Sequence, residues 1–522
     1  MTKILRYRLK PEIALDEASF AAFVHAKLGD TAQWKLLKRS IDARSKRVSV
    51  EVEIGLSEKG ENPRPFLYEK PTNHVANKPE VVIIGAGPAG LFAALRCIEL
   101  GAKPIVLERG KDVQERRRDL AAINKEHKVN PDSNYCFGEG GAGTYSDGKL
   151  YTRSKKRGDV TRILEILVAH GSDENILVDT HPHIGTNKLP KVIADMRETI
   201  LSRGGKIHFN TRVEDFVIQN QEIKGVKIQD GSIVEGIGVI LATGHSARDI
   251  FRLLQKSGIK IESKPFALGL RVEHPQTIID QIQYHCDSRG EFLPAAAYSL
   301  ATQTQFEGKQ RGVFSFCMCP GGFIVPAATA DGEIVVNGMS PSKRDSKFAN
   351  SGIVVAVENE DLQAYEEEGD FKALAFQAEV EQNACLAAGG TQTAPAQRLV
   401  DFVKGRISTN LPDCSYQPGL ASVNMKEFLP ESIYLRLVDG FKSFGRKSKG
   451  YYTNEAQVLG VESRTSSPVH VPRNRETLEH VEVKRLFPCG EGAGYAGGIM
   501  SAAIDGEKCA EKLIEAYLDI RC

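Results

Sequence analysis

A glycine-rich turn between an apolar run and a helical pattern constrains the fold of this chain more than any other feature. The turn spans residues 85–90, the apolar run spans residues 81–84, and the helical pattern covers residues 91–100. A second apolar run follows at residues 103–107. Strand, helix and strand in this order predict a parallel sheet with a right-handed crossover.

The glycines of this turn have the spacing of a dinucleotide-binding turn. Gly85 permits a tight turn, Gly87 lets a pyrophosphate approach the backbone, and Gly90 lets the helix pack against the strand. The N-terminus of the helix, which begins at Pro88 and Ala89, then presents free backbone N–H groups, none of them from Pro88, and the positive end of the helix dipole to the phosphate.

The same glycine spacing occurs at residues 138–143 and 492–497, but neither copy has the required context. The first copy lacks a hydrophobic strand before it and a helix after it. The second leaves only 25 residues after Gly497, too few for another strand and its acidic residue. We therefore assign the dinucleotide to residues 85–90, with Glu108 at the end of the next strand accepting the adenosine ribose hydroxyls.

Two further segments favour FAD over NAD. Residues 241–244 resemble the Ala-Thr-Gly turn of two-dinucleotide flavoproteins. Residues 486–492 resemble their second FAD motif, in which an acidic residue holds the ribityl chain; Glu491 stands where many of those proteins have aspartate. The helix that follows directs its N-terminus at the pyrophosphate or at the N1–C2=O edge of the flavin.

Six longer motifs resemble the signature of a group of uncharacterised bacterial and plastid FAD-dependent dehydrogenases of the glutathione-reductase-like superfamily. They lie at residues 39–44, 137–150, 244–249, 316–322, 461–468 and 490–499. The resemblance covers nearly the whole chain. It implies a flavin domain of the glutathione-reductase type with non-covalent FAD, whose N5 accepts or donates a hydride.

The motifs and the resemblance together predict a set of cofactor-binding positions. In this set the glycine cluster before Ser146 is expected to wrap the flavin rather than to form a merely flexible loop. The predicted positions are Gly85, Gly87, Pro88, Ala89, Gly90, Glu108, Arg109, Gly140, Gly141, Thr144, Ser146, Val213, Thr243, Gly244, Gly490, Glu491, Gly497, Gly498 and Ile499.

The expected fold class is α/β, with a doubly wound parallel-sheet FAD-binding domain, an inserted mixed α/β cap and a small N-terminal α+β module. Asp16 caps a helix in that module, and apolar residues alternate over residues 48–54 as in a half-buried strand. We also expect a linker at residues 63–79, a strand at 333–337, and helices at 371–388 and 499–517. The predicted units are residues 1–70 for the module, 76–262 and 455–522 for the FAD domain, and 263–454 for the substrate or cap domain.

The composition argues against several classes of function. The 522 residues are 41% hydrophobic and 26% charged with a net charge of +1, which argues against attraction to nucleic acid or an anionic membrane. The chain shows no secretory signal and no stretch of 18 apolar residues, so a cytoplasmic protein with free thiols is expected. Cys317 and Cys319 lack the CxxC spacing and are interpreted as small packed residues; no metal site is predicted.

Several polar residues have both a structural and a functional interpretation. His245, Arg248 and Arg464 are weak catalytic candidates, although a buried and satisfied histidine is favoured for His245 and also for His274. Guanidinium groups suit carboxylate substrates, which makes Arg464 and Arg473 candidates for substrate recognition. Lys149 and Arg153 are either solvated residues or groups that steer an anion into the site. Arg271 and Glu273 form either an ion pair or part of a site. The basic runs at residues 116–118 and 155–157 are interpreted as solvated surface.

The predicted function is that of an FAD-dependent dehydrogenase acting on a small-molecule substrate. Because a second dinucleotide-binding unit with its own acidic residue is not evident, NAD(P)H is expected to bind only transiently as a reductant. Two alternatives remain open, a flavin-binding partner or assembly module without turnover and a flavin monooxygenase.

Overall fold

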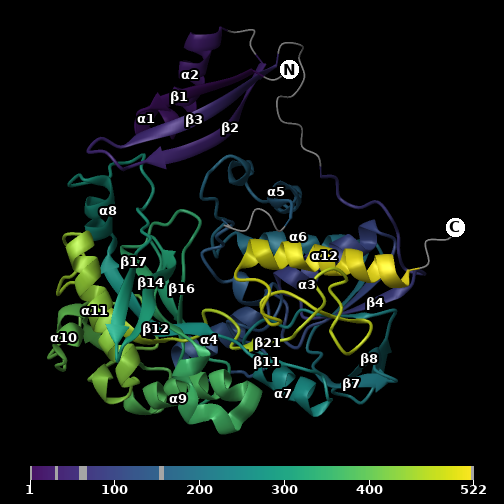
Figure 1. Cartoon of the computed structure of the whole chain (residues 1–522). Coiled ribbons are helices and arrows are strands. Elements are labelled where there is room, and N and C mark those ends of the chain that lie inside the picture. The colour runs from purple at the N-terminus through teal and green to yellow at the C-terminus, as the bar shows by residue number, and fades with distance from the viewer. Residues whose placement is uncertain (1–2, 30–32, 58–67, 152–157, 519–522) are drawn as a thin grey trace.

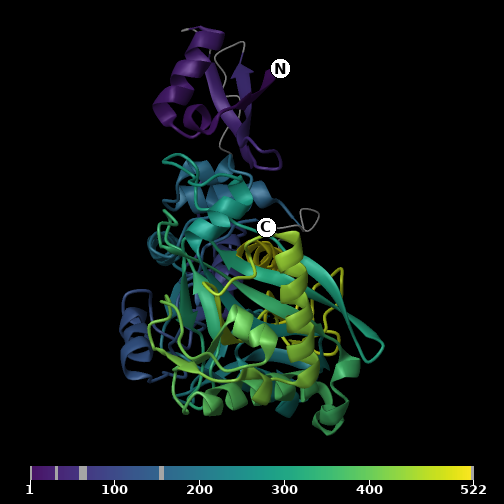
Figure 2. The same cartoon turned by 90° about the vertical axis from the view of Figure 1, so that its left-hand side faces the viewer.

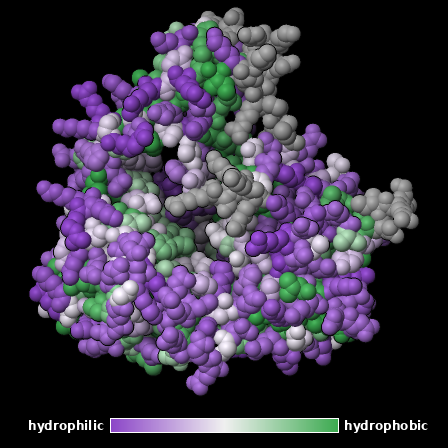
Figure 3. Space-filling view, viewed as in Figure 1, coloured by the Kyte–Doolittle hydropathy of each residue, from purple (hydrophilic) through white to green (hydrophobic). Residues whose placement is uncertain are grey.

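The computed structural model describes residues 3–29, 33–57, 68–151 and 158–518 of the 522 residues. In Figure 1 the N-terminal residues form a separate unit above the rest of the chain, and the rotated view in Figure 2 shows the same separation. Among the described residues, no helix is long and apolar enough to cross a membrane. The face in Figure 3 is mostly hydrophilic, with hydrophobic residues in scattered patches.

The N-terminal unit is a three-stranded antiparallel sheet packed against α2. Its strands run in the order β1-β3-β2, and Val50, Val52 and Ile54 of β3 are buried, as their alternation predicts. Asp16 caps α2 by accepting a hydrogen bond from the N–H of Ser19 (2.8 Å), which confirms the predicted helix start. The elements are β1 (Lys3–Leu9), α1 (Pro11–Ala14), α2 (Glu17–Leu28), β2 (Gln33–Asp42) and β3 (Ser49–Ser57).

The glycine turn lies in a five-stranded parallel sheet of order β22-β10-β4-β5-β6. Both faces of β4, β5, β10 and β22 are buried, which explains their nearly continuous apolar sequence, whereas the edge strand β6 is largely exposed. Helices α3, α5, α6 and α12 pack on one face, whereas α7 and the antiparallel sheet β7-β8-β9 pack on the other. The strands are β4 (Glu80–Ile84), β5 (Lys103–Leu107), β6 (Lys206–His208), β7 (Val213–Gln219), β8 (Glu222–Ile228), β9 (Ile233–Glu235), β10 (Val239–Leu241) and β22 (Leu486–Pro488). The helices are α3 (Pro88–Glu99), α4 (Arg116–Glu126), α5 (Val160–Ala169), α6 (Leu189–Ser202), α7 (Arg248–Lys256) and α12 (Ile499–Tyr517).

A second large sheet has seven strands in the order β13-β14-β17-β12-β20-β18-β19 and is antiparallel except for the pair β18-β19. With α8 to α11 it forms the largest apolar cluster of the chain. The strands are β12 (Phe266–Pro275), β13 (Ala301–Phe306), β14 (Lys309–Cys319), β17 (Phe348–Val357), β18 (Ala394–Arg398), β19 (Leu420–Ser422) and β20 (Gln457–Glu462). The helices are α8 (Gln276–Tyr284), α9 (Lys372–Ala387), α10 (Leu399–Lys404) and α11 (Glu431–Lys447).

Two short strand pairs complete the structure, β15 (Phe323–Pro326) with β16 (Val336–Met339), and β11 (Glu262–Ser263) with β21 (Val469–His470). The strand expected over residues 333–337 therefore begins and ends later than predicted. The division of the chain into domains stays a prediction; β20, although it lies after residue 454, pairs with β12 and β18 of the seven-stranded sheet.

Two interpretations of charged residues are wrong. Arg116 is fully buried rather than solvated, because its guanidinium donates to the backbone oxygens of Asn134, Glu139 and Gly141 at 2.7–3.0 Å. Arg271 does not pair with Glu273. It forms an ion pair with Glu462 at 2.7 Å. Residues 155–157 and Arg153 lie outside the described residues.

Removing the N-terminal unit at residue 57 is expected to leave FAD binding intact. The polar contacts between this unit and the rest of the chain centre on Arg39. Arg39 forms an ion pair with Asp179 at 2.7 Å and exchanges backbone hydrogen bonds with the segment around Thr180. We expect a folded truncation with unchanged FAD content, measured by flavin absorbance per polypeptide.

The truncation should stop before Tyr68, because that residue belongs to the apolar core around the five-stranded sheet. Tyr68 is buried, and its backbone N–H donates to Glu165 at 3.0 Å. Tyr68→Ala in the full chain is the matched control and should lower the unfolding midpoint more than the truncation does. Loss of FAD from the truncation would contradict an independent N-terminal unit.

Candidate functional site

A cavity opens at the carboxyl edge of the five-stranded sheet. Strands β5 and β10 flank β4 on opposite sides, so the order in which strands are added to the sheet reverses next to the glycine turn. Ligands in open parallel sheets bind at such a switch point. The cavity holds about 1590 Å³ of space outside protein atoms, including its mouth. Its opposite wall comes from β14 and β16, which lie outside that parallel sheet.

Most of the predicted cofactor positions lie in the wall of this one cavity, although they come from segments far apart in the chain. They are Gly85, Gly87, Pro88, Ala89, Glu108, Arg109, Gly141, Ser146, Val213, Thr243, Gly244, Glu491, Gly497, Gly498 and Ile499. Their contact with a cofactor stays a prediction, but the fold brings them together.

Four other predicted positions do not line the cavity and instead hold its wall segments together. A Cβ atom at Gly90 would lie 1.9 Å from the carbonyl oxygen of Gly85, so the helix packs tightly on the turn. The N–H of Gly140 donates to Ala86 O, and the hydroxyl of Thr144 donates to Glu139 O. The N–H of Gly490 donates to the carboxylate of Asp505 at 2.8 Å.

Two helix N-termini converge on the cavity. Helix α3 starts after Gly87 and α12 starts after Gly498, and both of these glycines line the cavity. The helices are in close contact, since a Cβ atom at Gly506 of α12 would lie 2.1 Å from the carbonyl oxygen of Ala89. The positive ends of two helix dipoles therefore face the same space, as a bound pyrophosphate would require.

Glu108 joins three backbone segments at the cavity. Its carboxylate is buried and accepts hydrogen bonds from the N–H groups of Ala86 (2.8 Å), Gly110 (2.9 Å) and Gly138 (3.0 Å). Each carboxylate oxygen has two acceptor sites, so one site, on Oε2, remains for a hydroxyl group on the cavity side. The neighbouring Arg109 also lines the cavity, but carboxylates hold its guanidinium.

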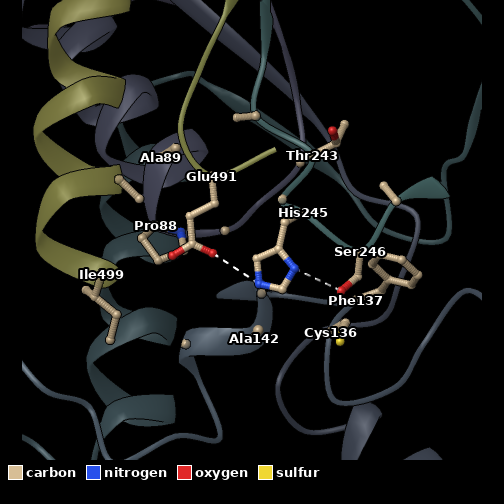
Figure 4. Close-up of a pocket in the computed structure, with 18 of the residues that line it drawn as sticks. Pro88, Ala89, Cys136, Phe137, Ala142, Thr243, His245, Ser246, Glu491 and Ile499 are labelled. Atoms are coloured by element: carbon tan, nitrogen blue, oxygen red, sulfur yellow. Dashed lines mark hydrogen bonds and ion pairs between the residues drawn. The ribbon is translucent and has the colours of Figure 1, made fainter. Parts of the chain in front are cut away.

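His245 and Glu491 meet between the β10 turn and the start of α12, as Figure 4 shows. Nε2 of His245 lies 3.5 Å from Glu491 Oε2, and Nδ1 lies 3.3 Å from the hydroxyl oxygen of Ser246. Glu491 also accepts the N–H of Gly498. Burial lowers the pKa of His245, with Arg464 acting in the same direction and Glu491 opposing it. A neutral imidazole that carries its proton on Nε2 satisfies both contacts.

Arg248 and Arg464, the other two catalytic candidates, belong to a buried charge network. Arg248 lies 3.0 Å from Glu333 and 2.7 Å from Glu381, and Arg464 lies 2.6 Å from Glu333 and 3.0 Å from Glu381. The guanidinium group of Arg464 also donates a hydrogen bond to the hydroxyl oxygen of Thr329. Only Arg464 reaches the cavity wall. These contacts favour a positioning role for both residues.

The remaining polar candidates are also engaged by the protein. Arg473 pairs with Asp505 at 2.6 Å, and the ammonium group of Lys149, which lines the cavity, donates to the carbonyl oxygen of Met318. His274 is buried as predicted, but only one of its nitrogens is satisfied: Nε2 lies 2.8 Å from Tyr451 O, whereas the buried Nδ1 has no partner among the described residues. Burial lowers the pKa of His274 to about 4.

The described residues contain one group with the spacing of a metal-ligand set, Cys489, Asp505 and Cys509, whose donor atoms lie within 4.8 Å of one another. The guanidinium of Arg473 already contacts Asp505 Oδ2 at 3.0 Å and Cys509 Sγ at 3.3 Å. The positive charge of Arg473 therefore lies beside these side chains, where a metal ion would otherwise be bound.

Sequence reasoning missed the wall that faces away from the five-stranded sheet. Cys317 is exposed and lies in the cavity wall, so its interpretation as a packed residue is wrong, whereas Cys319 is buried as expected. The motif at residues 316–322 was the signal for this wall, but its pattern does not indicate which side chains face a ligand. The wall residues that were not predicted include Cys136, Phe137, Asp147, Ser246, Phe316, Cys317, Cys319, Asn337, Gly338 and Thr465.

The cavity fits FAD on grounds that the structure itself provides. A Cβ atom placed at Gly244, Gly497 or Gly498 would meet no heavy atom within 4 Å, so the backbone at these positions borders open space. Gly87 and Gly141 face each other, with a Cβ atom at Gly141 lying 3.3 Å from Gly87 Cα. Bare backbone, two helix N-termini and a carboxylate are the contacts that a dinucleotide needs.

Three family models match the chain. Residues 80–116 match an FAD binding domain, residues 265–465 match the C-terminal domain-like part of an FAD-dependent protein, and residues 1–56 match a domain of unknown function. Among solved structures, a glycine oxidase from Bacillus cereus is 14% identical, with a TM-score of 0.30 over 84% of this chain and 96% of that one.

Two relatives set the extent of the similarity. A thiamine thiazole synthase from Methanococcus vannielii is 27% identical over 192 residues, which is 34% of this chain and 60% of that enzyme. An uncharacterised protein from Clostridium beijerinckii is 38% identical over 507 residues, which is 94% of this chain and 93% of the relative. The chain therefore belongs to the same family as the Clostridium protein, a family of FAD-dependent oxidoreductases.

Proposed function

We propose that the protein is an FAD-dependent dehydrogenase that transfers a hydride between flavin N5 and a small organic substrate. The observation that carries this proposal is a single cavity with two unlike walls. One wall holds the predicted FAD segments, and the other comes from β14, β16 and the residues after β20. A cofactor on the first wall would present its reactive face to a substrate on the second.

Each part of the first wall has a chemical role toward the cofactor. Glu108 would hold the adenosine ribose, and the backbone at Gly87, at the N-terminus of α3, would hold the pyrophosphate. Glu491 would hold the ribityl chain, and the bare backbone at Gly497 and Gly498 would border the isoalloxazine ring. Bound in this way, FAD supplies two-electron transfer at N5.

The second wall supplies orientation and exclusion of water. Phe316 offers an apolar surface, Asn337 offers an amide that both donates and accepts, and Lys149 supplies a positive charge. His245 is held by Glu491 and Ser246 at the junction of the two walls. With Nε2–H directed at Glu491, Nδ1 of the neutral imidazole would accept a proton from a substrate group, or return one, through the Ser246 hydroxyl in the cavity wall.

Nicotinamide would serve as a transient reductant. The described strands form one all-parallel sheet, with one glycine turn of the required context, and this supports a single dinucleotide site. NADH or NADPH would then enter the substrate side of the cavity, deliver a hydride and leave before the organic substrate binds.

Anaerobic flavin reduction tests this function directly. Holoenzyme is mixed with NADH, NADPH and a panel of organic reductants, and loss of the oxidised flavin absorbance is followed in time. We expect saturable reduction by one nicotinamide or one reductant class. Reduction by dithionite alone would contradict a dehydrogenase, and substrate-dependent oxygen uptake with oxygen insertion would favour the monooxygenase alternative.

Glu491→Ala is expected to weaken FAD binding mildly. The change removes one charged acceptor near the proposed ribityl position and the acceptor for the N–H of Gly498. A net hydrogen bond is worth about 0.5–1.5 kcal/mol, so the Kd for FAD should rise roughly two- to tenfold. Fluorescence titration of apoprotein with FAD measures this change, and exposed Glu476→Ala is the matched control. Equal Kd values in the two variants would remove Glu491 from the site.

A further inference from the structure

We propose that Cys317 and Cys319 form a thiol–disulfide couple that exchanges two electrons with the flavin, as a second redox centre in the same cavity. This inference rests on the proposed function only for the position of the flavin. Both cysteines line the cavity that also contains Gly87, Gly497 and Gly498.

The backbone of β14 favours a bond between these two residues. In a regular extended strand the Cα atoms of residues i and i+2 lie about 6.6 Å apart. That distance is at the upper edge of the range of roughly 4.4–6.8 Å found for disulfides. A bulge bends β14 between the two cysteines, since Phe316 pairs with Gly352 but Cys319 pairs with Asn350, leaving one extra residue on β14.

The bulge places Cys317 in a conformation that strands do not adopt. Its φ is +43°, in the left-handed region, whereas regular strand residues have negative φ. The thiol of Cys319 donates to the carbonyl oxygen of Cys317 at 3.2 Å, so this side chain already folds back along the bulge toward its neighbour.

Two cations hold the carbonyl groups of the bulge. Arg271 donates to the carbonyl oxygen of Cys317 at 3.4 Å and is itself anchored by Glu462 at 2.7 Å. Lys149 donates to the carbonyl oxygen of Met318. Although the Cys317 side chain borders the cavity, desolvation by the surrounding protein raises its pKa to about 11, while the charges of Lys149 and Arg271 act in the opposite direction. The same two cations act in that direction on the buried Cys319 thiol.

The two thiols differ in access, which assigns their roles. Cys317 is exposed in the cavity wall, so its sulfur is the one that a cavity-bound group meets, and buried Cys319 is the resolving partner. Cys136 also lines the cavity, but its thiol donates to the carbonyl oxygen of Ala327 at 3.6 Å. Cys136 is therefore the natural competitor for pairing with Cys317, and the experiment must separate the two.

The flavin would accept or supply the two electrons of this exchange. When the dithiol is oxidised, both S–H bonds break and one S–S bond forms between Cys317 and Cys319. Two electrons and one proton are taken up by oxidised FAD, and the second proton leaves to solvent. In the reverse direction reduced FAD supplies the two electrons, the S–S bond breaks, and each sulfur gains a proton.

Electron counting on the holoenzyme tests the proposal. Protein oxidised with excess ferricyanide, and then freed of it, is titrated anaerobically with dithionite while flavin absorbance is recorded. We expect the wild-type chain to take up about four electrons per FAD, two for the flavin and two for the disulfide. Cys317→Ser and Cys319→Ser should each take up about two. Cys286→Ser, at a half-buried thiol that does not line the cavity, should keep the wild-type value.

Peptide mass mapping of the same oxidised samples gives a second readout that does not depend on flavin turnover. We expect the peptide with residues 317–319 to resist alkylation until reductant is added and to be about 2 Da lighter than its reduced form. Uptake of two electrons by the wild type, with both cysteines alkylated without reductant, would overturn the proposal. A disulfide mapped to Cys136 would overturn the assigned pair. Because the mapping needs no substrate, it stands even if no organic reductant reduces the flavin.

Discussion

Gly497→Val is expected to weaken FAD binding about a hundredfold while the chain stays folded. A Cβ atom at this position meets no heavy atom within 4 Å, so the protein itself tolerates the side chain. The added methyl groups would instead occupy the cavity where the isoalloxazine ring is proposed to lie. An overpacked contact costs about 1–3 kcal/mol, and the upper end of that range corresponds to about a hundredfold in Kd. FAD content after gel filtration and the flavin spectrum measure the effect.

The control for this variant is Gly312→Val. Gly312 lies on β14 away from the cavity wall, and a Cβ atom there would make only ordinary contacts, the nearest at 3.8 Å to the ring of Phe314. Valine suits a strand, so this variant should retain FAD fully. A folded Gly497→Val protein with wild-type flavin content, spectrum and reduction rate would refute the assignment of the α12 N-terminus to the flavin.

Glu108→Ala should lower both FAD affinity and the stability of the apoprotein. Loss of a charged hydrogen bond to the ribose costs about 1.5–3 kcal/mol, which is roughly ten- to hundredfold in Kd. In addition, the variant leaves the N–H groups of Ala86, Gly110 and Gly138 without their acceptor. An unsatisfied buried donor costs about 1–3 kcal/mol, so the urea midpoint of the apoprotein should fall as well.

Two matched variants separate these effects. Glu115→Ala removes an exposed carboxylate just before α4 and should leave both FAD content and the midpoint unchanged. Glu108→Gln keeps one acceptor oxygen and should recover part of the stability, but not the charged contact to the ribose. If Glu108→Ala lowers the midpoint while its Kd for FAD equals that of the wild type, Glu108 only shapes the turn.

The elements around the glycine turn follow from local sequence. Helix α12 covers Ile499–Tyr517, the range predicted from its pattern, and β5 likewise covers Lys103–Leu107. A helix start, an apolar run and a glycine turn are each determined within a few neighbouring residues, by backbone sterics and by the period of apolar side chains. For the same reason the order of strand, turn and helix was sufficient to predict a dinucleotide site and its edge of the sheet.

Tertiary structure alone decided which polar groups meet. Arg464 reaches Glu333 across 131 residues, and Arg271 reaches Glu462 across 191 residues. No period in the sequence encodes such a pairing, because it depends on which strands become neighbours and in what register. The burial of Arg116 and the exposure of Cys317 in the cavity have the same origin. A one-residue bulge in β14 changes the direction of every side chain after it, and only the packed sheet determines where that bulge lies.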